Sequence, residues 1–425
     1  MTQAPQVTWR SWLMWGLGAG FFFYAFLQRT STSVLVPDLM RAFDVGASAL
    51  GGLSGFYFYA YFLVQLPTGL MTDRFGPRRL LALAALVSAA GGLLFASADG
   101  LTMAGIGRFF VGAGAGFAFV CTLRIATDWF PPERLAMLSG MTMMIGMTGG
   151  VTGQAPLAFA VGAFGWRPTM AAIALIGLVV AVVVWLIAKE QRPQGRATGT
   201  GDQGGTRVLA GLAIVLKRGQ TWILAGYGFA ITVVMFAFGG LWAVPFLQQI
   251  HGFSRPDAAF AGSLILLGWG LFAPLVGWAS DRWRRRKLPL VAAALASLIT
   301  IVPVVFMTEL SAMAIRVLLF ANGVAMAGMV ASFAAVREHN DTAHAGTSMA
   351  FVNMSLIGAG AVMQPVVGWL LDLGWQGTIV DGVRVYSLEA YQNAFLVLPA
   401  SCAAALVLAL MVRETHGKPQ VAEYR

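Results

Sequence analysis

Long, nearly uncharged blocks of apolar residues recur along this sequence and constrain its fold more than any other feature. Three of them run from Trp12 to Val36, from Leu80 to Ala98 and from Pro168 to Ala188. Each is about 20 residues long, the length that a helix needs to cross the hydrocarbon core of a bilayer. Only 11% of the residues are charged, against about a quarter in a soluble domain. The chain is therefore predicted to be a polytopic integral membrane protein.

Charges, prolines and turn residues divide the chain into twelve expected spans. The blocks are too long for the strands of a membrane barrel, which alternate apolar and polar residues over about ten positions. The predicted fold class is therefore an all-α membrane protein with twelve transmembrane helices. The spans are expected at 12–36, 47–72, 78–98, 101–128, 134–162, 167–188, 219–249, 256–280, 287–308, 311–336, 344–373 and 388–412.

The net charge of +10 is distributed as a signal of membrane topology. With both termini inside, basic residues gather in the inner loops, as in the run from Arg284 to Lys287. Fewer fall on the outer side or just inside its helix ends: Arg41, Arg108, Arg167, Arg255, Arg316 and Arg384. This asymmetry follows the positive-inside rule. The expected partners are the lipid bilayer and a small molecule, with no nucleic acid, and a monomer is expected.

A hydrophilic stretch near the middle separates two similar halves. Residues 189–218 are rich in Gly, Thr, Gln and Arg, a composition typical of a flexible linker. The segment GLMTDRFGPRR at 69–79 corresponds to GWASDRWRRRK at 277–287, 208 residues further on. Repetition at matching places indicates two copies of one unit. The expected domains are a six-helix bundle at 1–188, a cytoplasmic linker at 189–218 and a second six-helix bundle at 219–425.

Three further segments accompany the 69–79 loop, its weaker second copy and the basic linker: RFFVGAG at 108–114, WFPPER at 129–134 and GWR at 165–167. Through these features the sequence bears a resemblance to the major facilitator superfamily of transporters. The resemblance implies two pseudo-symmetric six-helix bundles around a central cavity and transport by alternating access. It also implies neither an enzymatic activity nor a cofactor.

A narrower likeness concerns three further segments. YAFLQR at 24–29, YFYAY at 57–61 and GGLWAVP at 239–245 are similar to a bacterial branch near the phagosomal amino-acid transporters and lysosomal dipeptide transporters. This likeness implies a bacterial inner membrane. It also implies a small substrate that bears a carboxylate, either anionic or zwitterionic.

Arg29 is a cation well inside the first expected span. A buried charge costs at least ~2.5–3.5 kcal/mol in a membrane helix, so it needs a physical reason. Arg29 shares a helical face with Thr32 and Ser33, and its planar guanidinium fits a carboxylate in a bidentate way. Arg29 is therefore predicted to bind the substrate anion. The alternative is an arginine that reaches toward the membrane surface or holds backbone carbonyls.

Arg124 and Asp128 lie four residues apart, so they can pair on one helical face. Arg337 and Asp341 repeat this spacing in the second half. Both pairs are interpreted as latches at the inner ends of spans four and ten. A contact between Arg124 and the substrate stays open as a second role.

Asp73, Arg74 and Arg78 belong to the best-matched motif and are predicted to gate transport rather than bind substrate. A carboxylate at an inner helix end can stabilise the positive N-terminus of a facing helix. Asp281 and Arg282 are expected to repeat this role in the second half. The alternative is that these charges are solvated loop residues.

Tyr57 and Tyr61 lie four residues apart and share a face, whereas Tyr59 points elsewhere. The two tyrosines are predicted to line the substrate cavity, with helix packing as the competing interpretation. Three further candidates for the cavity are Gln154, Trp242 and Asn353. The glycines at 112, 114 and 116 are expected to let helices approach closely.

The expected spans contain no Asp, Glu or His near their centres. A multidrug/proton antiporter of the same fold usually places an acid there. Because this sequence has none, the antiporter is only the second functional hypothesis, after the transporter of a carboxylate-bearing metabolite. A transporter-like sensor or a membrane enzyme is the third. The missing acid predicts facilitated diffusion, exchange, or coupling through a proton that the substrate itself carries.

Overall fold

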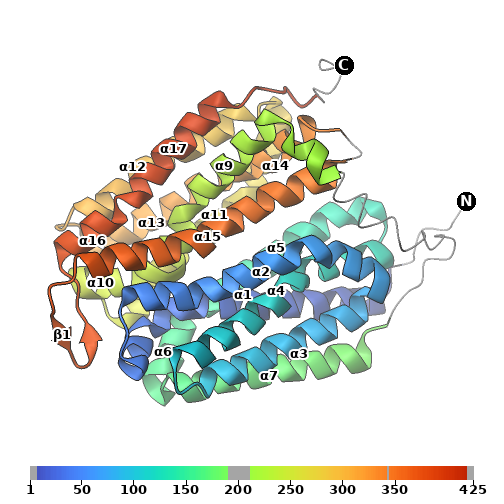
Figure 1. Cartoon of the computed structure of the whole chain (residues 1–425). Helices are drawn as coiled ribbons and strands as arrows, with labels where there is room; N and C mark the ends of the chain where they lie inside the picture. The colour runs from blue at the N-terminus through green and yellow to red at the C-terminus, as the bar shows by residue number, and fades with distance from the viewer. Residues whose placement is uncertain (1–6, 190–210, 342–343, 419–425) are drawn as a thin grey trace, which may run out of the picture. The chain divides into compact units, whose positions relative to one another are not determined.

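The computed structural model describes residues 7–189, 211–341 and 344–418, which are largely helical (Figure 1). The chain forms two compact units. The first comprises Met1–Ser31 and Phe56–Gly204, and the second comprises Thr32–Gly55 and Gly205–Arg425. Two long helices, α1 (Trp9–Phe43) and α2 (Ala47–Phe75), therefore contribute residues to both units.

The remaining elements of the first unit are helices joined by short loops. Gly76 begins α3 with a positive φ of 80°, and Pro77 follows it at the first helical position. The elements are α3 (Pro77–Ala96), α4 (Leu101–Trp129), the 3-10 turn η1 (Pro132–Arg134), α5 (Leu135–Thr152), α6 (Ala155–Phe164) and α7 (Trp166–Ile187).

The second unit adds a π-helix and a small hairpin to its helices. Serines cap the N-termini of three of its helices by accepting a backbone N–H bond. The elements are α9 (Gly219–Val233), η2 (Val234–Trp242), α10 (Ala243–His251), α11 (Arg255–Trp283), α12 (Lys287–Phe306), α13 (Ala312–Met326), η3 (Ala327–Met329), α14 (Val330–Glu338), α15 (Ala345–Leu373), β1 (Ile379–Val380), β2 (Val383–Arg384), α16 (Leu388–Phe395) and α17 (Val397–Met411).

Within each unit the helices run between two ends. In the first unit we call the linker end the one where α7 stops and the α2–α3 turn lies, and in the second unit the one where α9 starts and the α11–α12 turn lies. The hairpin end is the end of the second unit where the α1–α2 turn and the β1–β2 hairpin lie.

Ten helices or helix runs of the described residues are long and apolar enough to cross a membrane. They coincide with ten of the expected spans. The other two expected spans correspond to α1 and to the pair α5 and α6. A run of polar residues, 28–33, lowers the hydropathy of α1, and a break at Gly153 and Gln154 divides the fifth span in two.

Glycines on α4 bring helix backbones into contact, as predicted. A Cβ at Gly112 would overlap the backbone oxygen of Tyr57 on α2, and a Cβ at Gly114 would overlap that of Ala84 on α3. The second unit repeats the arrangement, because a Cβ at Gly323 on α13 would overlap the backbone oxygen of Ile265 on α11. Equivalent helices of the two units therefore pack through equivalent small residues.

Candidate functional site

Six consecutive polar residues lie in the interior of α1 and are all buried. They run from Gln28 to Ser33, and Arg29 is the most exposed of them at 8%. A helix can hide short hydroxyl side chains by bonding them to its own carbonyls, as Ser31 does with the carbonyl of Gln28 at 2.9 Å. A long cation cannot be hidden in this way, so the surroundings of Arg29 define the candidate site.

Aromatic rings surround the Arg29 guanidinium in the first unit. Its Cζ lies 4.3 Å from the ring centre of Phe26, 5.0 Å from that of Tyr61 and 5.6 Å from that of Tyr57. Arg29 Nε donates to the Tyr57 hydroxyl at 3.3 Å, and this hydroxyl donates to the Ala25 carbonyl at 3.3 Å. The negative ring faces attract the cation. The rings and the Tyr57 hydroxyl therefore help to hold the positive charge of Arg29 in the interior of the unit.

Tyr57 and Tyr61 stack at 6.3 Å on one face of α2, while Tyr59 is 40% exposed on another. Both tyrosines therefore lie beside Arg29. The sequence predicts each of the three residues for the substrate cavity but does not predict that they touch one another. Their contact with a substrate stays a prediction.

Arg108, which the sequence places on the outer side or just inside an outer helix end, is a second buried cation in the same cluster. It is seven residues into α4, about 10 Å along the helix axis, and only 1% exposed. Its Nη1 donates to the Gln28 carbonyl at 2.8 Å, and its Cζ lies 5.0 Å from the Tyr57 ring centre. The helical spacing from Arg108 to Gly112 is the sequence signal that places both on the side of α4 that faces α2.

Polar groups of the cluster are left without partners in the described structure. Nε and Nη2 of Arg108 are buried with no hydrogen bond, and so is Oε1 of Gln28. The Gln28 amide nitrogen donates to the Tyr24 hydroxyl at 2.9 Å. Unpaired buried donors on a guanidinium are costly, and they form a ready set of donors for an anion.

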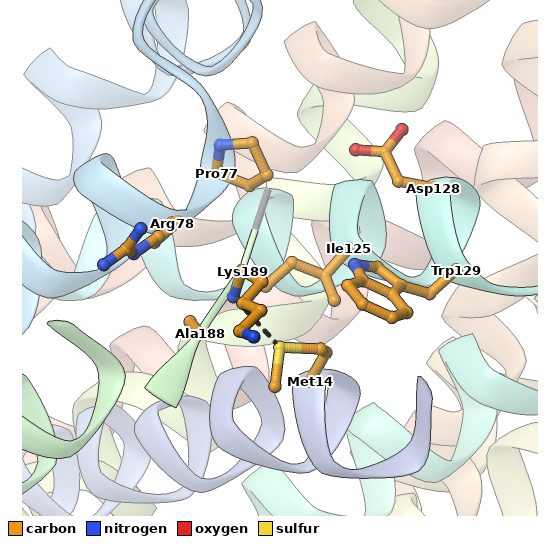
Figure 2. Close-up of a pocket in the computed structure, with 8 residues that line it drawn as sticks. All are labelled: Met14, Pro77, Arg78, Ile125, Asp128, Trp129, Ala188 and Lys189. Carbon is orange, nitrogen blue, oxygen red and sulfur yellow. Dashed lines mark hydrogen bonds between the residues drawn. The ribbon is translucent and has the colours of Figure 1, made fainter. Parts of the chain in front are cut away.

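Arg124 pairs with Asp128 at 3.2 Å at the linker end of the first unit. A small cavity there is lined by Asp128, Arg78, Lys189 and Met14, with Pro77, Ile125, Trp129 and Ala188 around them (Figure 2). It encloses about 20 Å³, room for one water molecule and too little for a metabolite. The structure thus brings two predicted gate residues, Arg78 and Asp128, to one place.

Arg78 is further held by α7, because its Nη2 donates to the Trp185 carbonyl at 2.7 Å. Its neighbour in the motif, Arg74, is exposed at the end of α2. The side chain of Asp73 lies outside the described residues. The predicted gate roles of these residues stay predictions.

The linker end of the second unit carries the remaining predicted gate residues. Asp281 pairs with Arg286 at 2.6 Å, and Arg282 is exposed. Asp341 pairs with Arg218 at 3.3 Å, whereas Arg337 is exposed. The latch expected between Arg337 and Asp341 is therefore replaced, in this structure, by a pair that fixes Asp341 to the start of α9.

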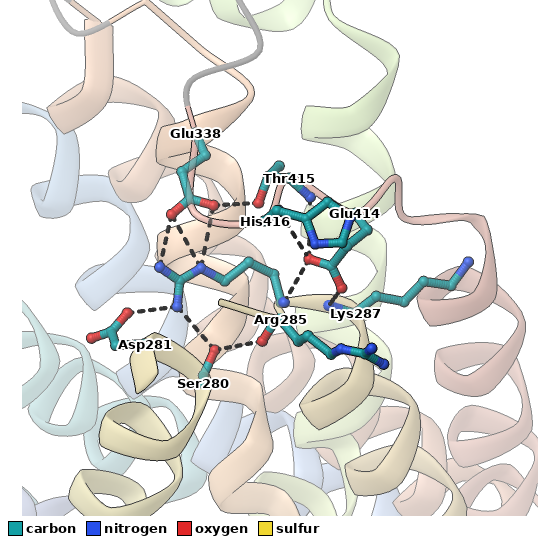
Figure 3. A network of polar contacts seen from close by, with 9 residues as sticks. Ser280, Asp281, Arg285, Lys287, Glu338, Glu414, Thr415 and His416 are labelled. Atoms are coloured by element: carbon teal, nitrogen blue, oxygen red, sulfur yellow. Dashed lines mark hydrogen bonds and ion pairs between the residues drawn. The ribbon is translucent and has the colours of Figure 1, made fainter. Parts of the chain in front are cut away.

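A denser network joins the α11–α12 turn to the segment after α17 (Figure 3). Arg286 Nη2 lies 2.8 Å from Glu338, and Glu414 accepts the backbone N–H groups of Arg286 and Lys287 at 2.7 and 3.0 Å. Partial burial acts to raise the pKa of Glu414, but these bonds and those from His416 and Thr415 outweigh it and hold the pKa below its usual range. Glu414 thus caps the N-terminus of α12 as a carboxylate.

The other three cavity candidates occupy separate places. Gln154 is fully buried in the break between α5 and α6. Trp242 is 1% exposed at the end of η2, where its Nε1 donates to the Gln364 carbonyl at 3.1 Å. Asn353 is half-buried on α15. Gln154 belongs to the first unit, and Trp242 and Asn353 belong to the second.

Solved structures share this fold at low sequence identity. A bacterial homologue of the human lysosomal transporter Spinster matches with a TM-score of 0.73 and 16% identity over 96% of both chains. A D-xylose–proton symporter matches with a TM-score of 0.71 and 16% identity, over 96% of this chain and 98% of that one. These matches confirm the predicted all-α membrane fold, and the count of twelve spans stays a prediction.

Several curated relatives are named after the small organic acid or anion that they transport. They include the probable sulfoacetate transporter of Cupriavidus necator, 24% identical over 62% of this chain and 64% of that protein. The 4-hydroxybenzoate transporter of Pseudomonas putida is 26% identical over 63% and 66%. The chloroplastic ascorbate transporter of Arabidopsis thaliana is 20% identical over 89% and 73%. The chain spans less than two thirds of the length of the first two.

The resemblance read from the motifs extends along almost the entire sequence. The Major Facilitator Superfamily family model matches residues 17–243 and again 228–425. These matches include the polar run of α1, the glycines of α4 and the repeated loop motif of both halves. The chain therefore belongs to the major facilitator superfamily of membrane transporters.

Proposed function

We propose that the protein carries a small carboxylate-bearing organic anion, or a zwitterion with a carboxylate, across the membrane by alternating access. Arg29 and Arg108 bind the anion beside Tyr57. One observation carries this proposal: the guanidinium groups of Arg29 and Arg108 are buried together on either side of the Tyr57 contacts, at 5.6 and 5.0 Å from its ring centre, and Arg108 keeps two buried donors without a hydrogen bond among the described residues.

The energetics of the cluster favour an anionic ligand. A buried unpaired donor costs about 1–3 kcal/mol, and more when it is charged. Arg108 has two such donors, Nε and Nη2. An anion that accepts from them offsets this cost and screens the repulsion between the two cations. Arg29 offers the same planar fork, which suits a carboxylate better than a neutral group.

The relatives support this class of substrate. Sulfoacetate and 4-hydroxybenzoate are small carboxylates, and ascorbate is a small organic anion without a carboxylate. The narrower likeness to amino-acid and dipeptide transporters stays a prediction, and it adds zwitterions to the compounds worth testing.

We further propose the oligomeric state, the membrane and the orientation in which the protein works. The protein works as a monomer in a bacterial inner membrane with both termini in the cytoplasm, as a transporter and not as an enzyme. Two six-helix bundles, 1–188 and 219–425, form the transporter, and residues 189–218 link them. The basic linker end is then the cytoplasmic end.

A thermal-shift screen of the purified protein tests the proposal. The panel holds organic acids, sulfonates, sugar phosphates, amino acids, dipeptides and lipophilic cations. A true ligand at a hundredfold excess over its Kd stabilises the protein by about 2.7 kcal/mol. We expect a small organic acid to stabilise the wild type and to be taken up by proteoliposomes.

Two variants make the screen specific. Arg29→Ala is expected to abolish stabilisation by the acid, and Arg316→Gln, which removes a cation from α13 of the second unit, is expected to leave it intact. Equal stabilisation in wild type and Arg29→Ala would reject the anion site. Stabilisation by lipophilic cations alone would favour the multidrug exporter.

A further inference from the structure

Residues 32–55 belong to the second unit although most of α1 and α2 belongs to the first. The segment comprises the end of α1, the α1–α2 turn and the start of α2, all at the hairpin end. The contacts that hold it are therefore contacts within the second unit. They form a set that the anion site does not use.

Asp372, near the end of α15, caps the N-terminus of α2. Its carboxylate accepts the backbone N–H groups of Ala47 and Ser48 at 3.1 and 2.8 Å. These N–H groups have no acceptor within the helix and carry the positive end of its dipole. An acid from one helix thereby fixes the free end of another.

Two neighbours complete the cap. Tyr386 donates to Asp372 at 2.7 Å, and Arg384 lies 3.5 Å from the same carboxylate. Burial, and after it the hydrogen bond to Asp372, raises the pKa of Tyr386. The phenol thus keeps its proton and remains a donor at neutral pH.

Small residues let α2 and α15 meet at their backbones. A Cβ at Gly51 would lie 2.5 Å from the Gln364 carbonyl oxygen, and a Cβ at Gly46 would lie 2.6 Å from the Asp372 carboxylate. Gly52, the next residue of α2, has nothing within 4 Å of its would-be Cβ. The close approach is therefore confined to the face of α2 that meets α15.

The end of α1 is held in the same region. Arg255, at the start of α11, pairs with Asp38 at 2.8 Å. Arg41 Nε donates to the Asp381 carbonyl at 2.7 Å, in the turn of the β1–β2 hairpin. The end of α1 and the start of α2 are thus held to the rest of the second unit through charged groups.

We propose that Asp372 is the latch of a gate at the hairpin end, which releases residues 32–55 from α15 during each transport cycle. Its role in transport rests on the proposed alternating access. The latched helices are the ones that carry the candidate site, since Arg29 is nine residues before Asp38 and Tyr57 is ten residues after Ala47. At 1.5 Å per residue, a movement of the latched ends acts on the anion site about 15 Å away.

Cysteine accessibility in the full-length, detergent-solubilised protein tests the latch without any substrate. Ser54 is fully buried, lies on the face of α2 with Ala47 and Gly51, and its hydroxyl has no partner among the described residues. The reporter is Ser54→Cys in a Cys121→Ala, Cys402→Ala background, labelled with a maleimide. We expect Asp372→Asn to raise the labelling rate roughly fivefold or more, as the loss of about 1 kcal/mol from the closed state would.

Matched variants decide the outcome. Asp257→Asn removes an acid at the same end that pairs with Arg316, and it is expected to label at the parental rate. Gly51→Ala is expected to raise the labelling rate of the reporter, whereas Gly52→Ala is expected to leave it unchanged. This second pair tests the latch independently if Asp372→Asn folds poorly. Equal rates within both pairs would overturn the latch. Loss of the anion effect in the thermal-shift screen would overturn only the proposed function, because labelling needs no ligand.

Discussion

At the scale of single residues, the planar fork of Arg29 and the hydroxyl of Tyr57 make different contributions to the anion site. Arg29→Lys keeps the charge but loses the fork, so we expect anion binding to weaken by roughly 1–2 kcal/mol. Tyr57→Phe removes the hydroxyl that accepts from Arg29 Nε and donates to the Ala25 carbonyl, and we expect a loss of about 0.5–1.5 kcal/mol. Titration calorimetry with the acid found in the screen measures both. Tyr59→Phe, on the exposed face, is the control, and an effect equal to that of Tyr57→Phe would contradict the assignment.

The sequence identifies Arg29 but not Arg108, and the reason is physical. A cation in the middle of an apolar block stands out because every neighbour on the chain is uncharged. Arg108 lies seven residues after the start of its helix, a depth from which an arginine commonly reaches the membrane surface. Only the tertiary contacts of α4 with α1 and α2 show that its side chain turns inward. The partner of Asp341 is hidden for the same reason, since Arg218 is distant in sequence.

At the scale of helices, the close packing of α4 against α2 predicts a cost for any added side-chain atom. Gly112→Ala places a Cβ against the Tyr57 backbone, so we expect a loss of about 1–3 kcal/mol in stability. Gly140→Ala, on α5, meets open space and is expected to be neutral or slightly stabilising. Thermal unfolding of both variants in detergent measures the difference. Equal melting temperatures would mean that α4 can move aside at little cost.

The cap on α12 predicts a dependence of stability on pH. Because the pKa of Glu414 is lowered in the folded protein, its stabilising contribution is present above the ordinary pKa of about 4.3 and is lost as the pH falls through the lowered value. Glu414→Gln is therefore expected to melt at a lower temperature than wild type at pH 7, with the gap closing in acid. Glu309→Gln, in an exposed loop, should show no gap. A gap that is constant with pH would show that Glu414 acts by shape alone.

Helix existence is predictable from this sequence, whereas local departures from the helix are not. Apolar length determines each span, because the backbone must satisfy its own hydrogen bonds in lipid. The break at Gly153 and Gln154 and the π-helix of Val234–Trp242 depend on tertiary bonds, such as that from Thr30 to the Gly150 carbonyl and that from Gln364 to the Phe236 carbonyl. The β1–β2 hairpin has a local signal, Asp381-Gly382, whose positive φ values suit a two-residue turn.

At the scale of the whole molecule, the loop motif of the first half predicts a gate that is separate from the anion site. Asp73 stands at the end of α2, about 24 Å of helix beyond Tyr57. Asp73→Asn is expected to abolish or strongly slow uptake while leaving binding within about threefold, since a helix-end charge acts on the equilibrium between states. Proteoliposome uptake and calorimetry measure the two effects. Asp99→Asn, in the exposed α3–α4 loop, is the control, and a wild-type rate in Asp73→Asn would remove the gate assignment.

The energy source of transport follows from where the acids lie, not from the fold. A D-xylose–proton symporter has the same fold, but fold does not determine coupling. Proton coupling needs a group that titrates within the membrane, and arginine does not release its proton in the accessible range. In this sequence the acids of the long helices, such as Asp38, Asp128 and Asp372, stand near helix ends, and those three are occupied by Arg255, Arg124 and the α2 N-terminus respectively.

We therefore expect facilitated diffusion, exchange, or coupling through a proton on the substrate itself. An imposed pH step across proteoliposomes, with equal substrate on both sides, should drive little accumulation of a substrate whose charge is fixed. A weak acid that binds in its protonated form should still accumulate, because it carries the proton with it. Strong uphill uptake of a permanently charged sulfonate, lost when Asp38 or Asp128 is changed to Asn, would place a coupling site at a helix end. In that case the ion pairs of these acids must break and re-form in each cycle.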